Sequence, residues 1–180
     1  MPSGTAKLAV DPALFSTGQG EWGTPQYLFD HLHSIYRFTI DLAATAENAK
    51  LQRFYTKEQD SLAQDWTGER GFLNPPYGRL IGKFVAKAHA ETLKCSTLTV
   101  VLLIPARTDT KWWHAHCALG EVRFIKGRLK FENPALPSWR ADGNFKLSPA
   151  PFPSAIVVFG AKARTGTTSY VVYKEPPTSP

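Results

Sequence analysis

Residues 70–107 read RGFLNPPYGRLIGKFVAKAHAETLKCSTLTVVLLIPAR, and this stretch decides the fold. Its last part, STLTVVLLIPAR at 96–107, is a continuous apolar run rich in β-branched residues, which is typical of a strand buried on both faces. The preceding RLIGKFVAKAHAETLK predicts a helix, and its apolar face holds Ile81, Phe84, Val85 and Ala88. The short run GFL at 71–73 predicts another strand. Strands that alternate with helices predict an α/β fold, parallel at the centre of its sheet.

Further elements flank this unit on both sides. TPQYLFDHLHSIY predicts a helix that begins after Thr24-Pro25, with Leu28, Leu32 and Ile35 on its apolar stripe beside Phe29. A short β-type run ends at Asp41, and DTKWWHAHCAL predicts a short helix at 109–119. Three more strand regions are expected at EVRFIKGRLKF (121–131, broken at Gly127), SAIVVFG (154–160) and SYVVY (169–173).

The length of 180 residues suits one domain, which we place at 21–174. Residues 1–20 are small and polar and are predicted to be flexible, and the tail 175–180 is predicted to be disordered. Residues 127–153 are rich in proline, glycine, aromatic and basic residues, and they predict a long surface loop. Long ordered loops often have a function, so residues 127–153 are the candidate segment for recognition of the target.

The composition narrows the class of protein. The net charge of +6 is compatible with nucleic acid as a partner, although many basic proteins never bind it. Cys95 and Cys117 are too few for a disulfide framework or a zinc site, so reduced thiols in a cytosolic protein are expected. No stretch approaches the length of a membrane span, and the N-terminus has no secretion-signal pattern, so a cytoplasmic location without membrane contact is predicted.

Two histidine pairs do not predict a metal site. His31/His33 and His114/His116 are each spaced two apart, and such pairs point away from each other on a helix. A bound metal is therefore not expected.

The turn Asn74-Pro75-Pro76-Tyr77 follows the predicted strand at 71–73, and open α/β sheets bind ligands beyond the carboxyl ends of their strands. The Asn74 side-chain oxygen and the Pro75 carbonyl are two acceptors that can hold both N–H groups of an exocyclic amine, such as that of adenine. The Tyr77 ring offers a face on which a flipped-out base can stack. The alternative is a structural role, either a proline turn that caps a strand or a proline-rich ligand segment.

Seven ordered blocks carry a family resemblance: EWGTPQYLFDHL, FTIDLAATAENAK, RFYTKEQDSLAQDW, FLNPPYGR, LLIPARTDTKWWH, EVRFIKGRLKF and PFPSAIVVF. Over approximately residues 21–160 the chain resembles the phage-type DNA N-6-adenine methyltransferases, the Dam-like family of bacteriophages and prophages. The resemblance implies methyl transfer from S-adenosylmethionine to adenine N6 in DNA, without a metal, on a Rossmann-like fold. It also implies that Asn74, Pro75, Pro76 and Tyr77 form the catalytic motif. The cytoplasm of a bacterial or phage-infected host cell is the corresponding location.

The resemblance implies a cofactor site as well. Asp41 resembles the acidic residue that opens the first cofactor loop, and its alternative is a turn residue at a strand end. That loop lacks the usual Gly-x-Gly, although Ala43 is small enough for close approach. Asp60 resembles the residue that accepts a hydrogen bond from the cofactor adenine, and its alternative is a helix N-cap. Thr24 and Pro25 resemble the pair that contacts the methionine end, although they can also simply start the helix.

Trp22 completes the predicted cofactor set, because it lies in the same family block as Thr24 and Pro25. Asp41 and Asn74 are 33 positions apart, which is too short for the further strand–helix units of a full doubly wound sheet. We therefore expect an abbreviated central sheet, with a cofactor site that is shallow or completed by a second subunit. A monomer and a homodimer both stay open.

Several residues are predicted to contact DNA: Arg79, Arg107, Lys111, Arg128, Lys130, Trp139 and Arg140. Arg107 follows a predicted strand end within a family block, and Trp139 beside Arg140 could stack on or wedge into DNA. For any single basic residue, a solvated surface position is the alternative. Trp112 and Trp113 are expected in the core or in a wall rather than on a base.

Three rival functions fit the same turn. An Asn-Pro-Pro-Tyr turn also serves methyltransferases that act on amino groups in RNA or on protein glutamine, because each of these substrates presents a planar nitrogen. The third hypothesis is a nucleic-acid-binding protein that has lost its catalytic activity, because the predicted cofactor loop lacks the usual glycines.

Overall fold

The computed structural model describes residues 22–132, 147–171 and 173. The main sheet has six strands, in the order β1 (Ile40–Asp41), β2 (Arg70–Leu73), β3 (Thr99–Pro105), β7 (Ser154–Gly160), β4 (Glu121–Ile125) and β8 (Thr168–Val171). β7 is antiparallel to both of its neighbours, and every other pairing in this sheet is parallel. The predicted α/β class with a mostly parallel, Rossmann-like sheet is therefore confirmed.

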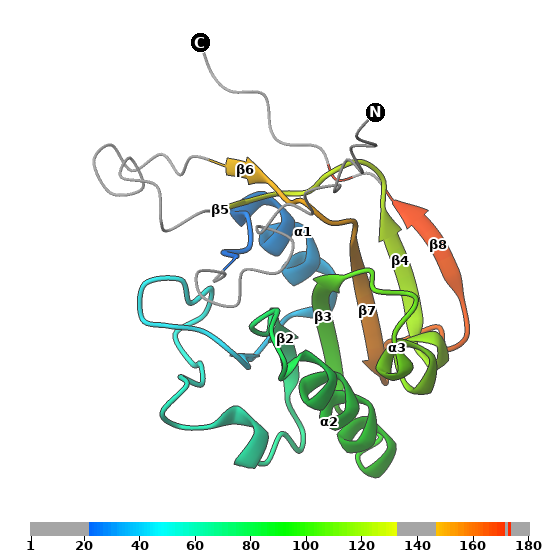
Figure 1. Cartoon of the computed structure of the whole chain (residues 1–180). Helices are drawn as coiled ribbons and strands as arrows, with labels where there is room; N and C mark the ends of the chain where they lie inside the picture. The colour runs from blue at the N-terminus through cyan, green and yellow to red at the C-terminus, as the bar shows by residue number, and fades with distance from the viewer. Residues whose placement is uncertain (1–21, 133–146, 172, 174–180) are drawn as a thin grey trace, which may run out of the picture.

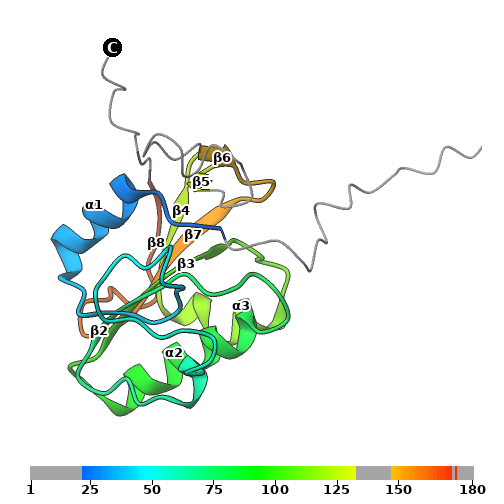
Figure 2. The same cartoon turned by 90° about the vertical axis from the view of Figure 1, so that its left-hand side faces the viewer.

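Helices cover both faces of this sheet. α1 (Gln26–Tyr36) lies on one face, and α2 (Ile81–Lys94) and α3 (Lys111–Ala115) lie on the other (Figures 1 and 2). Two short 3-10 helices, η2 (Ser61–Ala63) and η3 (Cys117–Leu119), follow β1 and α3 along the chain. The molecule thus has three layers, with the sheet in the middle.

β3 shows why the sheet is covered on both sides. Val101 and Leu103 pack into the cluster that contains α1, whereas Val100, Leu102 and Ile104 pack into the cluster that contains α2. All five side chains are completely buried. Successive strand residues point to opposite faces, so a continuous apolar run is what two covered faces require.

The buried face of α1 differs from the predicted stripe at one position. Leu28, Phe29 and Leu32 are buried as expected, but Ile35 is 44% exposed and Tyr36 is buried in its place. The rings of Phe29 and Tyr36 shift the centre of the buried face away from Ile35, which lies at its margin in the last turn.

The abbreviated sheet is confirmed in the segment between β1 and β2. Within the described residues 42–69, the only β-pairing is an isolated bridge from Phe54 to Asp41, and η2 is the only helix. Two backbone hydrogen bonds form this bridge. Asp41 N–H donates to the Arg53 carbonyl oxygen, and Tyr55 N–H donates to the Asp41 carbonyl oxygen. The connection 42–69 is therefore long but contains no further strand–helix unit.

The segment 127–153 is not only a surface loop. Its described parts form a second, two-stranded sheet in which β5 (Lys130–Glu132) and β6 (Leu147–Pro149) pair antiparallel. Leu129 and Phe131 are buried in the cluster that contains α1. The high content of proline and basic residues obscured the short apolar pattern at Leu129 and Phe131, so the prediction of a surface loop over the whole segment was wrong.

Among the described residues, every helix is too short or too polar to span a membrane.

Candidate active site

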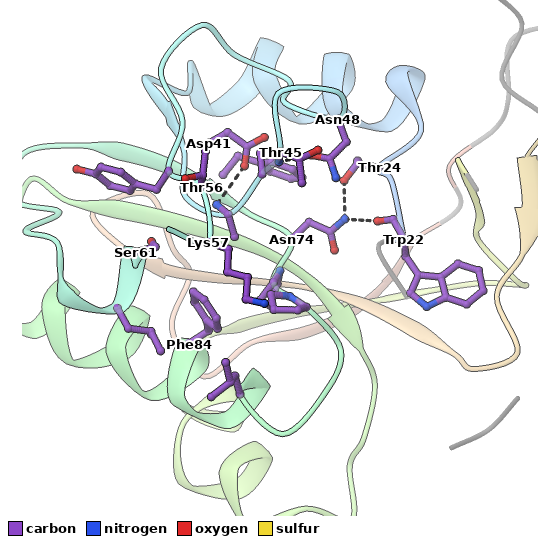
Figure 3. A pocket seen from close by; sticks show the side chains of 18 of the residues that line it. Trp22, Thr24, Asp41, Thr45, Asn48, Thr56, Lys57, Ser61, Asn74 and Phe84 are labelled. Atoms are coloured by element: carbon purple, nitrogen blue, oxygen red, sulfur yellow. Dashed lines mark hydrogen bonds between the residues drawn. The ribbon is translucent and has the colours of Figure 1, made fainter. Parts of the chain in front are cut away.

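The candidate site lies where β1 and β2 end. Asp41 is the last residue of β1 and pairs in register with Phe72, and Asn74 directly follows β2. Because these strands are parallel neighbours, their carboxyl ends meet at one edge of the sheet. A cavity of about 600 Å³ opens there, within the size range of small-molecule sites. Asp41 and Asn74 line this cavity, together with side chains from the connection 42–69 and from the start of α2 (Figure 3).

Asn74 is held in one orientation by residues about fifty positions earlier in the chain. Its Nδ2 donates to the Trp22 carbonyl oxygen at 2.6 Å and to Thr24 Oγ1 at 3.0 Å (Figure 3). A backbone carbonyl can only accept, so the nitrogen of the side-chain amide must face Trp22. The other amide atom, Oδ1, is buried and has no hydrogen-bond partner among the described residues. The site therefore holds a fixed acceptor with unused capacity.

The rest of the turn divides between the cavity and the core. Pro75 and Pro76 line the cavity, and neither has a backbone N–H. Tyr77 is not among the lining residues in the described part: its hydroxyl donates to the Leu103 carbonyl oxygen at 3.2 Å. Burial raises the pKa of Tyr77 well above its usual value, so the hydroxyl stays protonated and keeps this bond.

Two aromatic contacts fix the Tyr77 ring. Its centroid lies 5.4 Å from that of Phe152 and 6.1 Å from that of Phe131, both edge-on. The ring thus joins the Asn-Pro-Pro-Tyr turn to Phe131 of β5 and to Phe152 after β6, a contact that the sequence did not predict. Stacking of a base on Tyr77 stays a prediction.

Asp41 places a buried carboxylate in the cavity wall, and the charge of Lys50 offsets its desolvation only in part. Asp41 is 2% exposed, and its carboxylate accepts hydrogen bonds from the backbone N–H groups of Ala43 at 3.4 Å and Lys50 at 3.2 Å. Desolvation by burial raises the pKa of Asp41 to about 6, although these two N–H groups act in the opposite direction. At neutral pH the group is a buried carboxylate suited to a positively charged ligand.

The other predicted cofactor residues fall into two groups. Trp22, Thr24, Ala43 and Asp60 line the cavity, as expected for a ligand-binding role. Pro25 does not line it: it precedes α1, and its carbonyl accepts from the first N–H groups of that helix. For Pro25 the structure matches the alternative, a helix start.

Asp60 forms the predicted cap and lies in the cavity wall, and its contact with the cofactor adenine stays a prediction. Its side chain accepts from Leu62 N–H at 3.2 Å and so caps η2, and the residue also faces the cavity. Its φ of 48° lies in the left-handed region, which is unusual for a residue other than glycine. The cap and the cavity wall therefore depend on one strained position.

Several cavity residues were not predicted: Ala44, Thr45, Asn48, Tyr55, Thr56, Lys57, Ser61, Leu62, Leu80 and Phe84. Ser61 is notable because its Oγ is buried and has no partner among the described residues. Most of these residues lie within the quoted blocks at 38–50 and 53–66. The sequence signal that could have identified these cavity residues was the group of polar residues in those blocks to which no structural role was assigned.

A buried ion pair ties the segment after β1 to the second sheet. Lys50 Nζ lies 2.9 Å from Glu132 Oε2, and the two side chains are only 7% and 4% exposed. Lys50 also donates to the Gln26 side-chain oxygen at 3.2 Å. Removal of one partner of such a pair leaves a buried charge alone, at a cost of about 3–5 kcal/mol.

The predicted DNA contacts lie on the surface. Arg79, Arg107, Lys111, Arg128 and Lys130 are exposed, and none of them is among the lining residues in the described part of the chain. Trp139 and Arg140 lie outside the described residues. Contact of these side chains with DNA stays a prediction.

Trp112 and Trp113 lie in the core, as expected, because both side chains pack in the cluster that contains α2. Among the described residues, no group of three or more histidine, cysteine, aspartate or glutamate side chains could hold a metal ion.

The mostly parallel sheet, the cavity at its carboxyl edge and the Asn-Pro-Pro-Tyr turn in the cavity wall define a Rossmann-like methyltransferase. A family model described as DNA N-6-adenine-methyltransferase (Dam) matches residues 14–174, and the chain belongs to this family.

Curated relatives agree with the family model. A protein named DNA N-6-adenine-methyltransferase from Haemophilus phage HP1 is 30% identical over 158 residues, which cover 86% of this chain and 87% of the relative. A protein of the same name from Escherichia phage T1 is 33% identical over 111 residues, covering 60% of this chain and 45% of the relative. The putative methyltransferase YfdM of Escherichia coli K12 is 37% identical over 65 residues, covering 32% and 70%. The predicted family and enzyme class, an adenine-specific DNA methyltransferase, are confirmed.

Proposed function

We propose that this protein transfers the methyl group of S-adenosylmethionine to the N6 amino group of adenine in DNA, with the target base extruded from the helix to reach Asn74. The observation that carries the proposal is the Asn74 amide, whose Oδ1 is buried, fixed and without a partner among the described residues.

Such an oxygen is suited to an amine. The exocyclic nitrogen of adenine is conjugated with the ring and is a weak nucleophile. When Asn74 Oδ1 accepts one of its N–H groups, the nitrogen is oriented and the positive charge that develops during methylation is stabilised. The Pro75 carbonyl is the proposed acceptor for the second N–H.

The energetics favour binding of a donor to this oxygen. A buried acceptor without a partner costs about 1–3 kcal/mol, and a bound amine removes this cost. Because Asn74 Oδ1 is shielded from solvent, neighbouring side chains must shift when the base enters. Once the base is bound, water does not compete for this hydrogen bond.

The cavity residues fit S-adenosylmethionine, which supplies an electrophilic methyl group on a positively charged sulfur. Asp41 contributes a buried carboxylate suited to a cationic ligand. Ala43 and Ala44 leave room for close approach, and the unpartnered Ser61 Oγ offers a hydrogen bond in the same cavity as Asp60. These residues, with Trp22 and Thr24, are the proposed cofactor wall.

The exposed basic residues support DNA as the substrate. An adenine inside a duplex cannot reach a buried amide, so extrusion of the base is part of the proposal. Arg79, Arg107 and Lys111 belong to the turn and helix starts near this edge of the sheet, where phosphate contacts would position the DNA. Methylation should therefore weaken steeply as the salt concentration rises.

The test is to incubate the protein with duplex DNA and S-adenosylmethionine and to measure N6-methyladenine by mass spectrometry of the nucleosides. We expect N6-methyladenine with the wild type. We expect at least a ~100-fold lower rate with Asn74→Ala, the range found when one preorganised polar group is removed from an active site. The variant should stay folded with a moderately lower melting temperature, because loss of the two hydrogen bonds from Nδ2 costs about 1–3 kcal/mol.

Three outcomes would contradict the proposal. Methyl transfer to tRNA or to a release factor in place of DNA would favour the rival substrates, which present the same kind of planar nitrogen. DNA binding without any methyl transfer would favour the decayed binding module. An Asn74→Ala variant that unfolds would assign the turn a structural role.

A further inference from the structure

We infer that the Trp22–Gly23 peptide sets the polarity of the Asn74 amide and that the Thr24 hydroxyl helps to position it, so that this site requires a neutral amide at position 74 and is disabled by a carboxylate there. The inference rests on the proposed function, in which Asn74 Oδ1 is the acceptor for the substrate amine.

Both N–H groups of the Asn74 side chain are committed to these partners. Nδ2 donates to the Trp22 carbonyl at 2.6 Å and to Thr24 Oγ1 at 3.0 Å. An amide nitrogen has two donors, so no third bond is available to it and the oxygen is left as the group that can meet a substrate. Rotation of the amide by half a turn would set Asn74 Oδ1 against the Trp22 carbonyl oxygen and lose that bond, whereas the Thr24 hydroxyl can either accept or donate. The polarity of the Asn74 amide is therefore decided by the Trp22 carbonyl, and Thr24 adds a second hydrogen bond that holds the amide in place.

The Trp22 carbonyl is itself fixed by β5. Gly23 N–H, which belongs to the same peptide group, donates to the Glu132 carbonyl at 2.9 Å, and Glu132 N–H donates to the Gly23 carbonyl at 2.8 Å. The C=O and N–H of a trans peptide point in opposite directions, so this one peptide spans from β5 to Asn74. Donation by its N–H also polarises the carbonyl and strengthens it as an acceptor.

Glycine at position 23 is required by this close approach. A Cβ at Gly23 would lie 2.9 Å from Glu132 Cβ and 3.1 Å from the Glu132 carbonyl oxygen. Glu132 cannot easily move away, because its carboxylate is held by Lys50 in the buried ion pair. Lys50 in turn donates its backbone N–H to Asp41. The peptide that orients Asn74 is thus built into the wall that also holds the cofactor loop.

The substitution Asn74→Asp follows directly from this arrangement. The atom that replaces Nδ2 is then an oxygen facing the Trp22 carbonyl, and it keeps the contact only when it carries a proton. The neutral carboxylic acid reproduces the wild-type pattern, with one O–H donor toward Trp22 and one acceptor toward the substrate. The ionised form sets two acceptors against each other, so the protein favours the protonated form and raises the pKa of the introduced carboxyl.

The first experiment compares Asn74→Asp with the wild type from pH 5 to pH 9. We expect the ratio of variant to wild-type kcat to fall about tenfold per pH unit above the pKa of the introduced carboxyl, reaching at least about 100-fold at pH 9, with KM for the methyl donor unchanged within threefold. A ¹³C NMR titration of the introduced carboxyl in the unliganded protein should give a pKa well above the ordinary value of about 3.9. A near-wild-type rate independent of pH, or an ordinary carboxyl pKa, would overturn the inference.

The second experiment alters the positioning groups. Thr24→Val should lower kcat about fivefold to tenfold, and Thr24→Ser should restore the rate. Gly23→Ala should also lower kcat. Thr92→Val, which removes the hydroxyl of a half-buried threonine in α2, is the matched control and should leave kcat unchanged. A Thr24→Val variant with normal kcat and weakened donor binding would make Thr24 a cofactor contact only, and would overturn its positioning role.

The two proposals fail separately. If the wild type methylates no adenine, the proposed function fails, and the NMR titration still decides whether the Trp22 carbonyl sets the polarity at position 74. If the wild type methylates adenine and the introduced carboxyl titrates normally, only the inference about positioning fails.

Discussion

Asp41 and Glu121 are two carboxylates with nearly equal burial and opposite surroundings. They are 2% and 1% exposed, and they lie at opposite ends of parallel strands: Asp41 ends β1, whereas Glu121 begins β4. Glu121 lies 2.8 Å from the Arg123 guanidinium and 3.4 Å from that of Arg164, and it also accepts from Arg164 N–H at 2.8 Å. Asp41 accepts from two backbone N–H groups and faces the cavity.

The pKa values follow these surroundings. Burial acts to raise the pKa of Glu121, but the Arg164 N–H and the Arg123 guanidinium outweigh it and leave the pKa below its usual value. Burial prevails at Asp41 and raises its pKa to about 6. Burial of a charge is therefore not by itself a sign of function. A buried carboxylate beside a cavity, whose desolvation the protein offsets only in part, is the more informative observation.

The largest effect that would test this contrast is on stability. Glu121→Ala leaves the half-buried Arg123 guanidinium without its carboxylate, so we expect the free energy of unfolding to fall by about 3 kcal/mol. Urea denaturation measures this loss. Donor affinity and the methylation rate per folded molecule should stay unchanged, because Glu121 is remote from the cavity. A lower rate with intact stability would mean that the two carboxylates do not have separate roles.

A second prediction concerns the pH dependence at Asp41. A pKa raised to about 6 in the folded state means that the protonated group favours folding at low pH, and that this contribution is lost as pH rises toward 6. In the wild type Asp41 should thus cost about 2–3 kcal/mol of unfolding free energy between pH 4 and pH 7. Asp41→Asn should remove this loss, as measured by urea denaturation at several pH values.

Donor binding provides the other half of the Asp41 test. We expect Asp41→Asn to bind S-adenosylmethionine about tenfold more weakly at pH 7.5 in titration calorimetry, because a charge-assisted hydrogen bond is lost. Wild-type affinity should weaken below pH 6, and the variant should lack this pH dependence. A variant that is less stable at pH 7 and binds the donor normally would make Asp41 a structural residue like Glu121.

The smallest expected effect is at Tyr77, which packs against the buried clusters on both faces of the sheet. Tyr77→Phe removes the hydrogen bond to the Leu103 carbonyl and keeps the ring contacts with Phe131 and Phe152. We expect a stability loss of about 1 kcal/mol and a methylation rate within about threefold of wild type. Tyr77→Ala should lower the rate more, since it removes the ring. The opposite order of these two rates would give the hydroxyl a direct part in the reaction.

Elements with a strong local pattern were predictable from the sequence. The apolar run at 96–107 identified β3, and Ile81, Phe84, Val85 and Ala88 identified the buried face of α2. The short spacing between Asp41 and Asn74 correctly indicated an abbreviated sheet. The errors occurred where the local pattern was weak, namely at Ile35 near the end of α1 and in the proline-rich segment that contains β5 and β6.

By itself the sequence determined the α/β class, the family and the presence of Asn-Pro-Pro-Tyr at a strand end, because each depends on neighbouring residues along the chain. Only the tertiary structure decided which atom of Asn74 is left unpaired, why Asp41 keeps a proton up to about pH 6, and that Tyr77 turns toward Phe131 and Phe152. Those properties arise from groups far apart in the sequence that packing brings within a few ångströms. Hydrogen-bond polarity and desolvation are set by that packing, and no local pattern encodes them.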